Sequence, residues 1–155
     1  KTQRSIKILS QVVEKDQRNH KAFLLLGEAY SSVQEYWAAA RALFRYVKLM
    51  PNDSDAWGML GHILIKQERY TQASRALLRA LKIQPNNTVF LKDFAFTLEK
   101  NRRFEQAISV LKKATSIDNE DAEASKKLGE LLLKLGRTQE AEQALQKAKS
   151  INPSH

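Results

Sequence analysis

The stretch that decides the fold is residues 54–87, SDAWGMLGHILIKQERYTQASRALLRALKIQPNN, because the rest of the chain repeats its pattern. With Ser54 numbered as position 1 of a 34-residue unit, position 20 is alanine in every copy: Ala39, Ala73, Ala107 and Ala141. A fixed period of this length indicates a stacked repeat protein, in which each unit packs mainly on its neighbours.

Each unit carries two apolar stripes at helical spacing. Positions 4, 7, 8 and 11, for example Trp57, Leu60, Gly61 and Leu64, predict a first helix, here called helix A. After a polar break, positions 20, 24 and 27 predict a second helix, helix B, and Pro or Asn ends it. Because Gly61 and Ala73 are small, we expect the two helices of a hairpin to approach closely.

The pattern resembles the tetratricopeptide repeat (TPR), whose signature W-x2-L-G is matched best by Trp57, Leu60 and Gly61. The resemblance implies an all-α fold, a right-handed α-solenoid of antiparallel helix pairs, the TPR superhelix. In that superhelix the A helices line a concave groove and the B helices form the convex back. Two residues depart from the pattern: Tyr46 replaces a small residue at position 27, and Ser125 replaces a large one at position 4.

The period divides the chain into four full units and a leading half. Residues 1–19 align with the second half of a unit, so the chain starts in mid-repeat, and the full units are 20–53, 54–87, 88–121 and 122–155. The last helix, 139–151, is polar, as a terminal capping helix should be. The first helix presents Ile6, Ile8, Leu9, Val12 and Val13 without an upstream partner, which predicts a missing repeat or self-association through this face.

Composition excludes several classes of function. The absence of cysteine removes disulfides and thiolate metal sites, and is typical of a cytoplasmic protein. No apolar run reaches the roughly 18 residues that a membrane helix needs, so we expect no membrane insertion. The three histidines are far apart and no serine has a neighbouring base, so we expect no catalytic set, no metal and no cofactor.

The first expected binding surface is the concave groove formed by the A-helix face opposite the stripe. Apolar side chains there have no reason to face solvent unless a peptide of a partner protein covers them. The alternative is tight packing of the same side chains between repeats. The candidate residues are Leu24, Glu28, Asp55, Met59, His62, Ile65, Val89, Lys92, Phe96, Lys100, Lys126 and Leu133.

One TPR subtype does not fit. Chaperone-tail binders are expected to hold a C-terminal carboxylate with Lys, Asn and Arg at fixed positions. The corresponding residues here are Leu24, Glu28, Met59, Val89 and Asp93 in one set, and these side chains could not bind a carboxylate pair.

The second expected surface is basic and lies on the convex face of the units 20–53 and 54–87. Spans 37–50 and 71–84 contain no acidic residue and together hold six of the nine net positive charges. The patch suits an acidic partner, and a plain solvated face is the alternative. The phosphates of nucleic acid would also suit the patch, although no recognised nucleic-acid motif is present. The patch residues are Trp37, Arg41, Phe44, Arg45, Lys48, Arg75, Leu78, Arg79 and Lys82.

The sequence thus predicts a protein–protein interaction module, a scaffold or adaptor that binds a peptide in its concave groove. Electrostatic binding of an acidic partner or nucleic acid by the basic convex face is the alternative.

Overall fold

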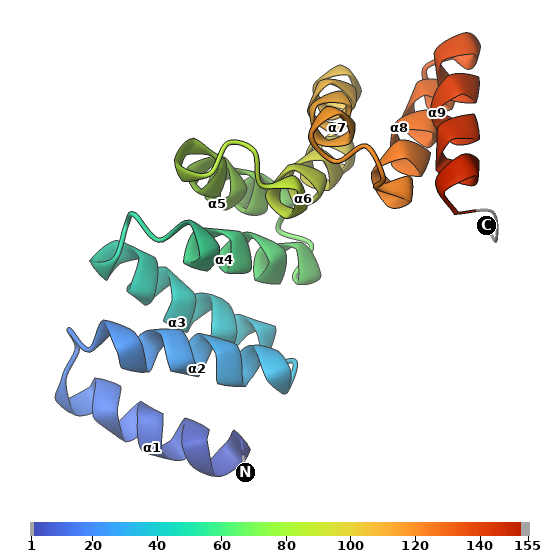
Figure 1. Cartoon of the computed structure of the whole chain (residues 1–155). Coiled ribbons are helices and arrows are strands. Elements are labelled where there is room, and N and C mark those ends of the chain that lie inside the picture. The colour runs from blue at the N-terminus through green and yellow to red at the C-terminus, as the bar shows by residue number, and fades with distance from the viewer. Residues whose placement is uncertain (1, 153–155) are drawn as a thin grey trace. The chain divides into compact units, whose positions relative to one another are not determined.

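The computed structural model describes residues 2–152, which form helices and turns without any strand, so the all-α prediction is confirmed. Helix α1 (Thr2–Lys15) precedes four hairpins, each made of an A helix and a B helix (Figure 1). The hairpins are α2 (His20–Ser32) with α3 (Tyr36–Leu49), α4 (Ser54–Lys66) with α5 (Tyr70–Ile83), α6 (Thr88–Lys100) with α7 (Phe104–Ile117), and α8 (Ala122–Lys134) with α9 (Thr138–Ile151).

The chain divides into two compact units, which are described separately. Unit 1 (Lys1–Pro85) contains α1 to α5, and unit 2 (Asn86–His155) contains α6 to α9. Each hairpin lies wholly within one unit.

The four A helices begin in the same way, with an Asn or Asp at the N-cap. Its side-chain oxygen accepts a hydrogen bond from the backbone N–H three residues later, which satisfies one of the free donors of the first turn. The donor–acceptor pairs are Ala22 to Asn19 (3.1 Å), Ala56 to Asp53 (3.0 Å), Phe90 to Asn87 (3.2 Å) and Ala124 to Asp121 (2.8 Å). These caps recur at the last position of the 34-residue period and therefore set where each A helix starts.

The turn between the helices of each hairpin contains one residue in the left-handed region. The φ angles are 61° at Gln34, 57° at Glu68, 60° at Arg102 and 73° at Gly136. The backbone N–H of the next residue donates a hydrogen bond to a carbonyl near the end of the A helix. Examples are Arg69 to Leu64 (2.9 Å) and Arg137 to Leu132 (2.9 Å). This left-handed residue closes the A helix and lets the chain reverse into the B helix.

Small residues set the distance between the helices of a hairpin. An added Cβ at Gly61 would lie 2.6 Å from Cγ of Leu77, and one at Gly27 would lie 2.6 Å from Cγ of Leu43. Gly129 meets Leu145 in the same way, whereas the third hairpin holds Ala95 at this position. Position 20 is also closed: Ala39, Ala73, Ala107 and Ala141 are all 0% exposed. The predicted role of these small residues is confirmed.

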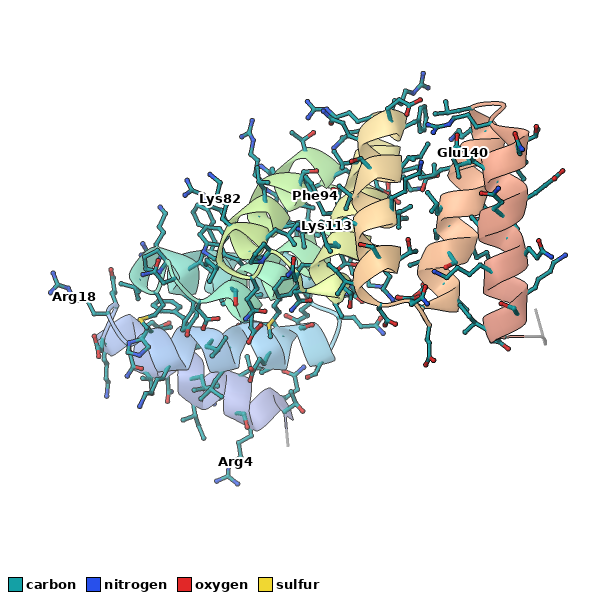
Figure 2. The ribbon with its side chains drawn as sticks, turned by 45° about the horizontal axis from the view of Figure 1, so that its top comes forward. Arg4, Arg18, Lys82, Phe94, Lys113 and Glu140 are labelled. Carbon is teal, nitrogen blue, oxygen red and sulfur yellow. The ribbon has the colours of Figure 1, made fainter. Side chains whose placement is uncertain are left out.

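Each unit has its own apolar core. In unit 1, Leu43 and Val47 of α3 lie in one buried cluster with Leu60 and Ile63 of α4. In unit 2 the cluster joins α6 to α9, and Phe94 packs against it from α6. Figure 2 shows charged side chains such as Arg4 and Arg18 pointing away from the ribbon of unit 1.

The prediction that α1 presents uncovered apolar side chains is wrong for Ile6, Leu9 and Val13, whereas self-association through this helix stays a prediction. Ile6 is buried in a cluster with Leu26 and Ala42, and Leu9 and Val13 pack against that cluster. Because α2 covers this side of α1, only Ile8 of the five predicted residues stays exposed, at 51%.

Tyr46, which departs from the repeat pattern, is buried, and its hydroxyl is hydrogen-bonded. Its hydroxyl donates to Oδ2 of Asp53 (2.7 Å), while Oδ1 of the same carboxylate caps α4. The hydrogen bond to Asp53, then burial and the negative charge of Asp53, raise the pKa of Tyr46 to about 12. Tyr46 thereby links the end of α3 to the start of α4.

Ser125, the other departure from the pattern, lies on α8 and is 1% exposed. Its hydroxyl has no hydrogen-bond partner among the described residues. A buried hydroxyl without a partner costs about 1–3 kcal/mol, so the small residue fits the space but not the polarity of the site.

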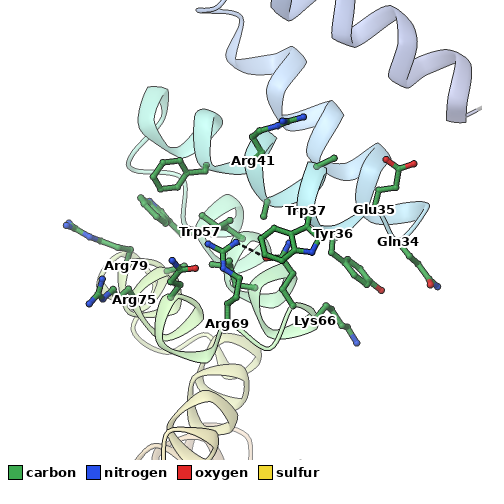
Figure 3. Close-up of a pocket in the computed structure, with 18 residues that line it drawn as sticks. Gln34, Glu35, Tyr36, Trp37, Arg41, Trp57, Lys66, Arg69, Arg75 and Arg79 are labelled. Carbon is green, nitrogen blue, oxygen red and sulfur yellow. Dashed lines mark hydrogen bonds between the residues drawn. The ribbon is translucent and has the colours of Figure 1, made fainter.

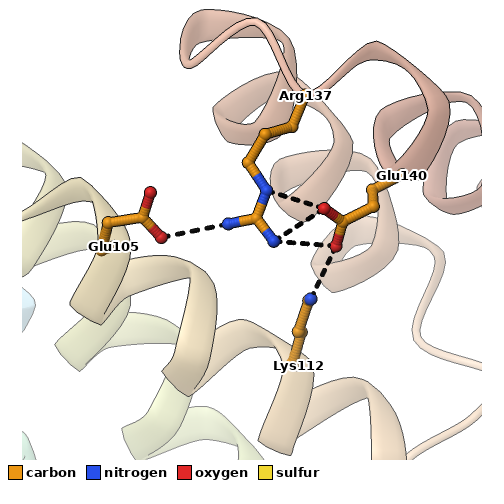
Figure 4. A network of polar contacts seen from close by, with 4 residues as sticks. All are labelled: Glu105, Lys112, Arg137 and Glu140. Carbon is orange, nitrogen blue, oxygen red and sulfur yellow. Dashed lines mark hydrogen bonds and ion pairs between the residues drawn. The ribbon is translucent and has the colours of Figure 1, made fainter.

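A polar network on the surface of unit 2 joins α7 to the start of α9 (Figure 4). Arg137 donates from Nε and Nη2 to the carboxylate of Glu140 (2.7 and 2.8 Å) and from Nη1 to Glu105 (3.0 Å). Lys112 also donates to Glu140 (2.8 Å). The hydrogen bonds from Arg137, then Lys112, lower the pKa of Glu140 to about 2. Because the network is exposed, salt screens it.

We predict that Gly136→Ala lowers the free energy of unfolding by about 1 kcal/mol, because an L side chain is disfavoured at φ 73°. No atom lies within 4 Å of the added Cβ, so the loss reports backbone conformation alone. Urea denaturation followed by circular dichroism measures it. In the matched control, Arg102→Gly, stability should stay equal or rise; a fall there would contradict the assignment of the turn.

We predict that Tyr46 makes stability depend on pH in alkali. The pKa of Tyr46 is raised by folding, so its contribution is complete below pH 10 and is lost as pH rises from 10 to about 12. Tyr46→Phe should remove this part of the pH dependence and lower stability at neutral pH by about 1–3 kcal/mol.

Asp53→Asn is the second variant for this test, since Asn still caps α4 but removes the charge beside the phenol. Spectrophotometric titration should then place the pKa of Tyr46 closer to its ordinary value of 10.0. An unchanged pKa in Asp53→Asn would contradict the assigned cause.

Candidate functional site

The residues predicted for the concave groove occupy the A helices, and the structure divides them by exposure. Leu24, Met59 and Ile65 are half-buried and pack against the core cluster of unit 1, as the packing alternative expected. Phe96 is also half-buried. The exposed members are Glu28, Asp55, His62, Val89, Lys100, Lys126 and Leu133.

Lys92 was predicted to be a groove residue, but in the structure it forms ion pairs within unit 2. Its ammonium lies 2.9 Å from Oδ2 of Asp121 and 3.0 Å from Oε2 of Glu123. Burial acts to lower the pKa of Lys92, but hydrogen bonds to both carboxylates outweigh it and raise that pKa. Burial likewise opposes the shift of Asp121, whose pKa is lowered by bonds from the Ala124 N–H and Lys92. Lys92 therefore ties α6 to the cap of α8.

Two further predicted groove residues have close neighbours within unit 2. The ammonium of Lys100 lies 5.2 Å from the ring centroid of Phe96, within range of a cation–π contact. Lys126 lines a cavity of about 420 Å³ between α8 and α9, together with Leu145 and Lys149.

The residues of the basic patch are exposed on α3 and α5. Trp37 is 70% exposed, Phe44 49% and Leu78 46%, which is high for side chains of this size. Lys48 lies over the Phe44 ring, with its ammonium 4.7 Å from the centroid. The basic side chains Arg41, Arg45, Arg75, Arg79 and Lys82 make no ion pair with any carboxylate in residues 2–152.

Part of this patch lines a groove of about 1020 Å³ between α3 and α5, named here the α3–α5 groove. Helices α3 and α5 both pack on α4, and Trp57, Leu60 and Leu64 of α4 lie between them in the lining. Trp37, Arg41 and Phe44 line it from α3, and Arg75 and Arg79 line it from α5. Figure 3 shows Trp37 and Arg69 in the middle of the groove, with Arg75 and Arg79 on the side of α5.

On the wall of the groove, the side chain of Arg69 contacts both Trp37 and Gln67. The guanidinium carbon of Arg69 lies 5.0 Å from the ring centroid of Trp37, and Nη1 of Arg69 donates to Oε1 of Gln67 (3.0 Å). Nε2 of Gln67 is buried and has no hydrogen-bond partner among the described residues. Trp57 is held separately, since its indole N–H donates to the carbonyl of Pro51 (2.9 Å).

Sequence reasoning missed several lining residues of this groove. Gln67 and Arg69 were taken as a polar break, and Trp57 was taken only as a stripe residue of helix A. Lys66, at the end of α4, also lines the groove. The signal that could have found Gln67 and Arg69 is the break itself, because both lie in the turn between α4 and α5 and line the space between α3 and α5.

Two other kinds of site are absent from residues 2–152. No three side chains of His, Cys, Asp or Glu lie together in a way that could hold a metal ion. None of the described helices combines the length and the apolar character needed to cross a bilayer.

Residues 3–154 match the family described as the cilia and flagella-associated protein 70 C-terminal domain, a TPR domain. The chain belongs to this family. The match covers nearly the whole chain, so the TPR resemblance drawn from the repeat pattern is confirmed.

Solved structures with similar folds are also TPR proteins. MamA is 22% identical, with a TM-score of 0.91 over 96% of this chain and 86% of that chain. YrrB, described as a TPR protein with an unusual peptide-binding site, is 24% identical, with a TM-score of 0.92 over 99% and 79%. A MamA fragment from Desulfovibrio magneticus RS-1 is 18% identical, with a TM-score of 0.90 over 99% and 87%. No curated protein matches the sequence.

These comparisons establish a TPR solenoid fold, and this fold indicates a general class of function. The TPR fold is generally a non-catalytic scaffold, and this TPR domain is a protein–protein interaction module. The partners to expect are proteins or peptides.

Proposed function

We propose that this TPR domain binds a peptide segment of a partner protein on the A-helix face of its hairpins. The observation that carries the proposal is the exposure of Val89 on α6 and Leu133 on α8, both in unit 2, at 59% and 47%. Each of these helices already buries its apolar stripe, and these two side chains lie outside it. A peptide that covers them would remove apolar surface from water, which is the main favourable term in most protein association.

Exposed polar and charged side chains on the A helices suit a peptide of mixed composition. Lys100 and Lys126 are exposed on the A helices of unit 2, where they would meet carboxylates of a ligand. Glu28 and His62 are exposed on the A helices of unit 1. An apolar centre with a polar rim is the usual arrangement of a specific protein interface.

The similarity to YrrB supports the class of ligand. That protein is described as having a peptide-binding site, and its structure matches 99% of this chain. A peptide is therefore a ligand that this fold can accommodate.

Electrostatic binding of an acidic partner through the basic patch is the second candidate. The specific observation in its favour is that Arg41, Arg45, Arg75 and Arg79 are exposed without an internal carboxylate partner in residues 2–152. Binding of this kind would weaken with rising salt, whereas binding through apolar contacts on the A-helix face would change little.

The test selects peptides from a random display library on the immobilised domain and measures their affinity by fluorescence anisotropy. We predict that Val89→Ser/Leu133→Ser weakens binding about tenfold or more, since each change removes apolar contact worth about 1 kcal/mol. Because both side chains are exposed, the fold should be unaffected, and circular dichroism checks this.

The matched control is Leu78→Ser/Ile83→Ser, which removes two exposed apolar side chains from the B helix α5. Binding to the control should stay within about twofold of wild type. Peptides that lose affinity with the control variant but not with Val89→Ser/Leu133→Ser would contradict the A-helix face as the site.

A further inference from the structure

We infer that the α3–α5 groove docks an acidic amphipathic helix of a partner protein. Residues of α3, α4 and α5 line the groove, and Val89 and Leu133 are not among them, so this second binding site can be tested separately from the first. Such a ligand matches the charge of the lining, the spacing of its arginines and its apolar residues.

The lining is strongly basic. Five basic residues (Arg41, Lys66, Arg69, Arg75 and Arg79) and a single acidic residue, Glu35, surround the groove. Arg41, Arg75 and Arg79 are exposed and pair with no carboxylate within residues 2–152. Like charges gathered in this way favour a ligand of opposite charge and repel a basic one.

The spacing of the arginines fits a helix. Arg75 and Arg79 are four residues apart on α5, so they lie on one face, separated by about one turn. Acidic residues four apart on a partner helix have the same separation. Arginine can bind each carboxylate through two parallel hydrogen bonds, which fixes orientation as well as charge.

The floor of the groove is apolar. Leu60 and Leu64 of α4 lie beneath it, and the rings of Trp37, Phe44 and Trp57 line it. Trp37, at 70% exposed, is the least buried large apolar side chain among the described residues. Leucine or aromatic residues on the apolar side of the ligand would cover these groups, whereas a purely polar acidic segment would not.

Gln67 holds Arg69 on the wall of the groove, because Nη1 of Arg69 donates to Oε1 of Gln67. The other end of this amide, Nε2, is buried and has no partner in the described chain, so a ligand in the groove does not reach it.

The floor favours protein over nucleic acid. Aromatic rings beside arginines also suit single-stranded nucleic acid, but the lining also includes the aliphatic side chains Leu60, Leu64 and Ala76. Leucine side chains match these groups, and nucleobases gain less from them.

The two tryptophans of the chain both line the groove, so their fluorescence reports its occupancy. The probe is a synthetic helical peptide of about 20 residues without tryptophan, with leucines on one face and glutamates four apart beside them. We predict a saturable change in fluorescence and an affinity that falls with added salt.

Two variants of equal charge separate the groove from the net charge of the chain. Arg41→Ser/Arg75→Ser/Arg79→Ser should weaken binding about tenfold or more. The control removes three exposed basic side chains that lie neither in the groove lining nor in the basic patch, two on α1 and one in the turn after it: Arg4→Ser/Lys7→Ser/Arg18→Ser. It should retain affinity within about threefold, and circular dichroism shows that both variants fold.

Three results would overturn the inference. Equal loss of affinity in both triple variants would mean that the probe reads only net charge. Equal binding by a peptide in which serines replace the leucines would remove the apolar part. Tighter binding of oligothymidine than of the peptide, with the same dependence on the groove arginines, would make the site one for nucleic acid.

Discussion

The close approach of the two helices in each hairpin is the constraint on which the rest of the structure depends. At Gly61 there is no room for a Cβ beside Leu77, and position 20 is sealed by alanines that are 0% exposed. With that distance fixed, the leucines and isoleucines of both helices meet in one core. Each 34-residue unit contains this contact once, together with one left-handed turn residue and one N-cap.

The same packing leaves two kinds of surface for binding. Each A helix buries one stripe against its hairpin partner, which leaves its opposite face with exposed side chains such as Leu25 and Val89. In unit 1, α3 and α5 each pack on α4, and the space between them is the α3–α5 groove. The groove is therefore a consequence of the hairpin geometry, but its chemistry comes from arginines and aromatic residues at positions that packing does not constrain.

Much of the fold could be predicted from the sequence, because the same pattern of packed residues recurs in four units. The stripe of Trp57, Leu60 and Leu64 and the small residues Gly61 and Ala73 were enough to predict A and B helices in close contact. The exposure of Trp37 and Phe44 also followed, since both fall outside the stripes.

The remainder depends on contacts that a helical period does not encode. The pairing of Lys92 with Asp121 needs two helices to be placed in space first. The burial of Ile6 depends on how much of α1 is covered by α2. The role of Gln67 and Arg69 depends on which side of their turn faces the space between α3 and α5, so a sequence-only interpretation found the basic patch but not the groove that part of it lines.

The measurement that tests the close-approach constraint most directly is a double-mutant cycle between Gly61→Ala and Leu77→Ala, with stability measured by urea denaturation. Gly61→Ala alone should cost about 1–3 kcal/mol, because Leu77 is fully buried and cannot move away. In the Leu77→Ala background the same change should be neutral or stabilising, since the space is then open and alanine is a better helix former than glycine. Additive effects of the two changes would contradict the constraint.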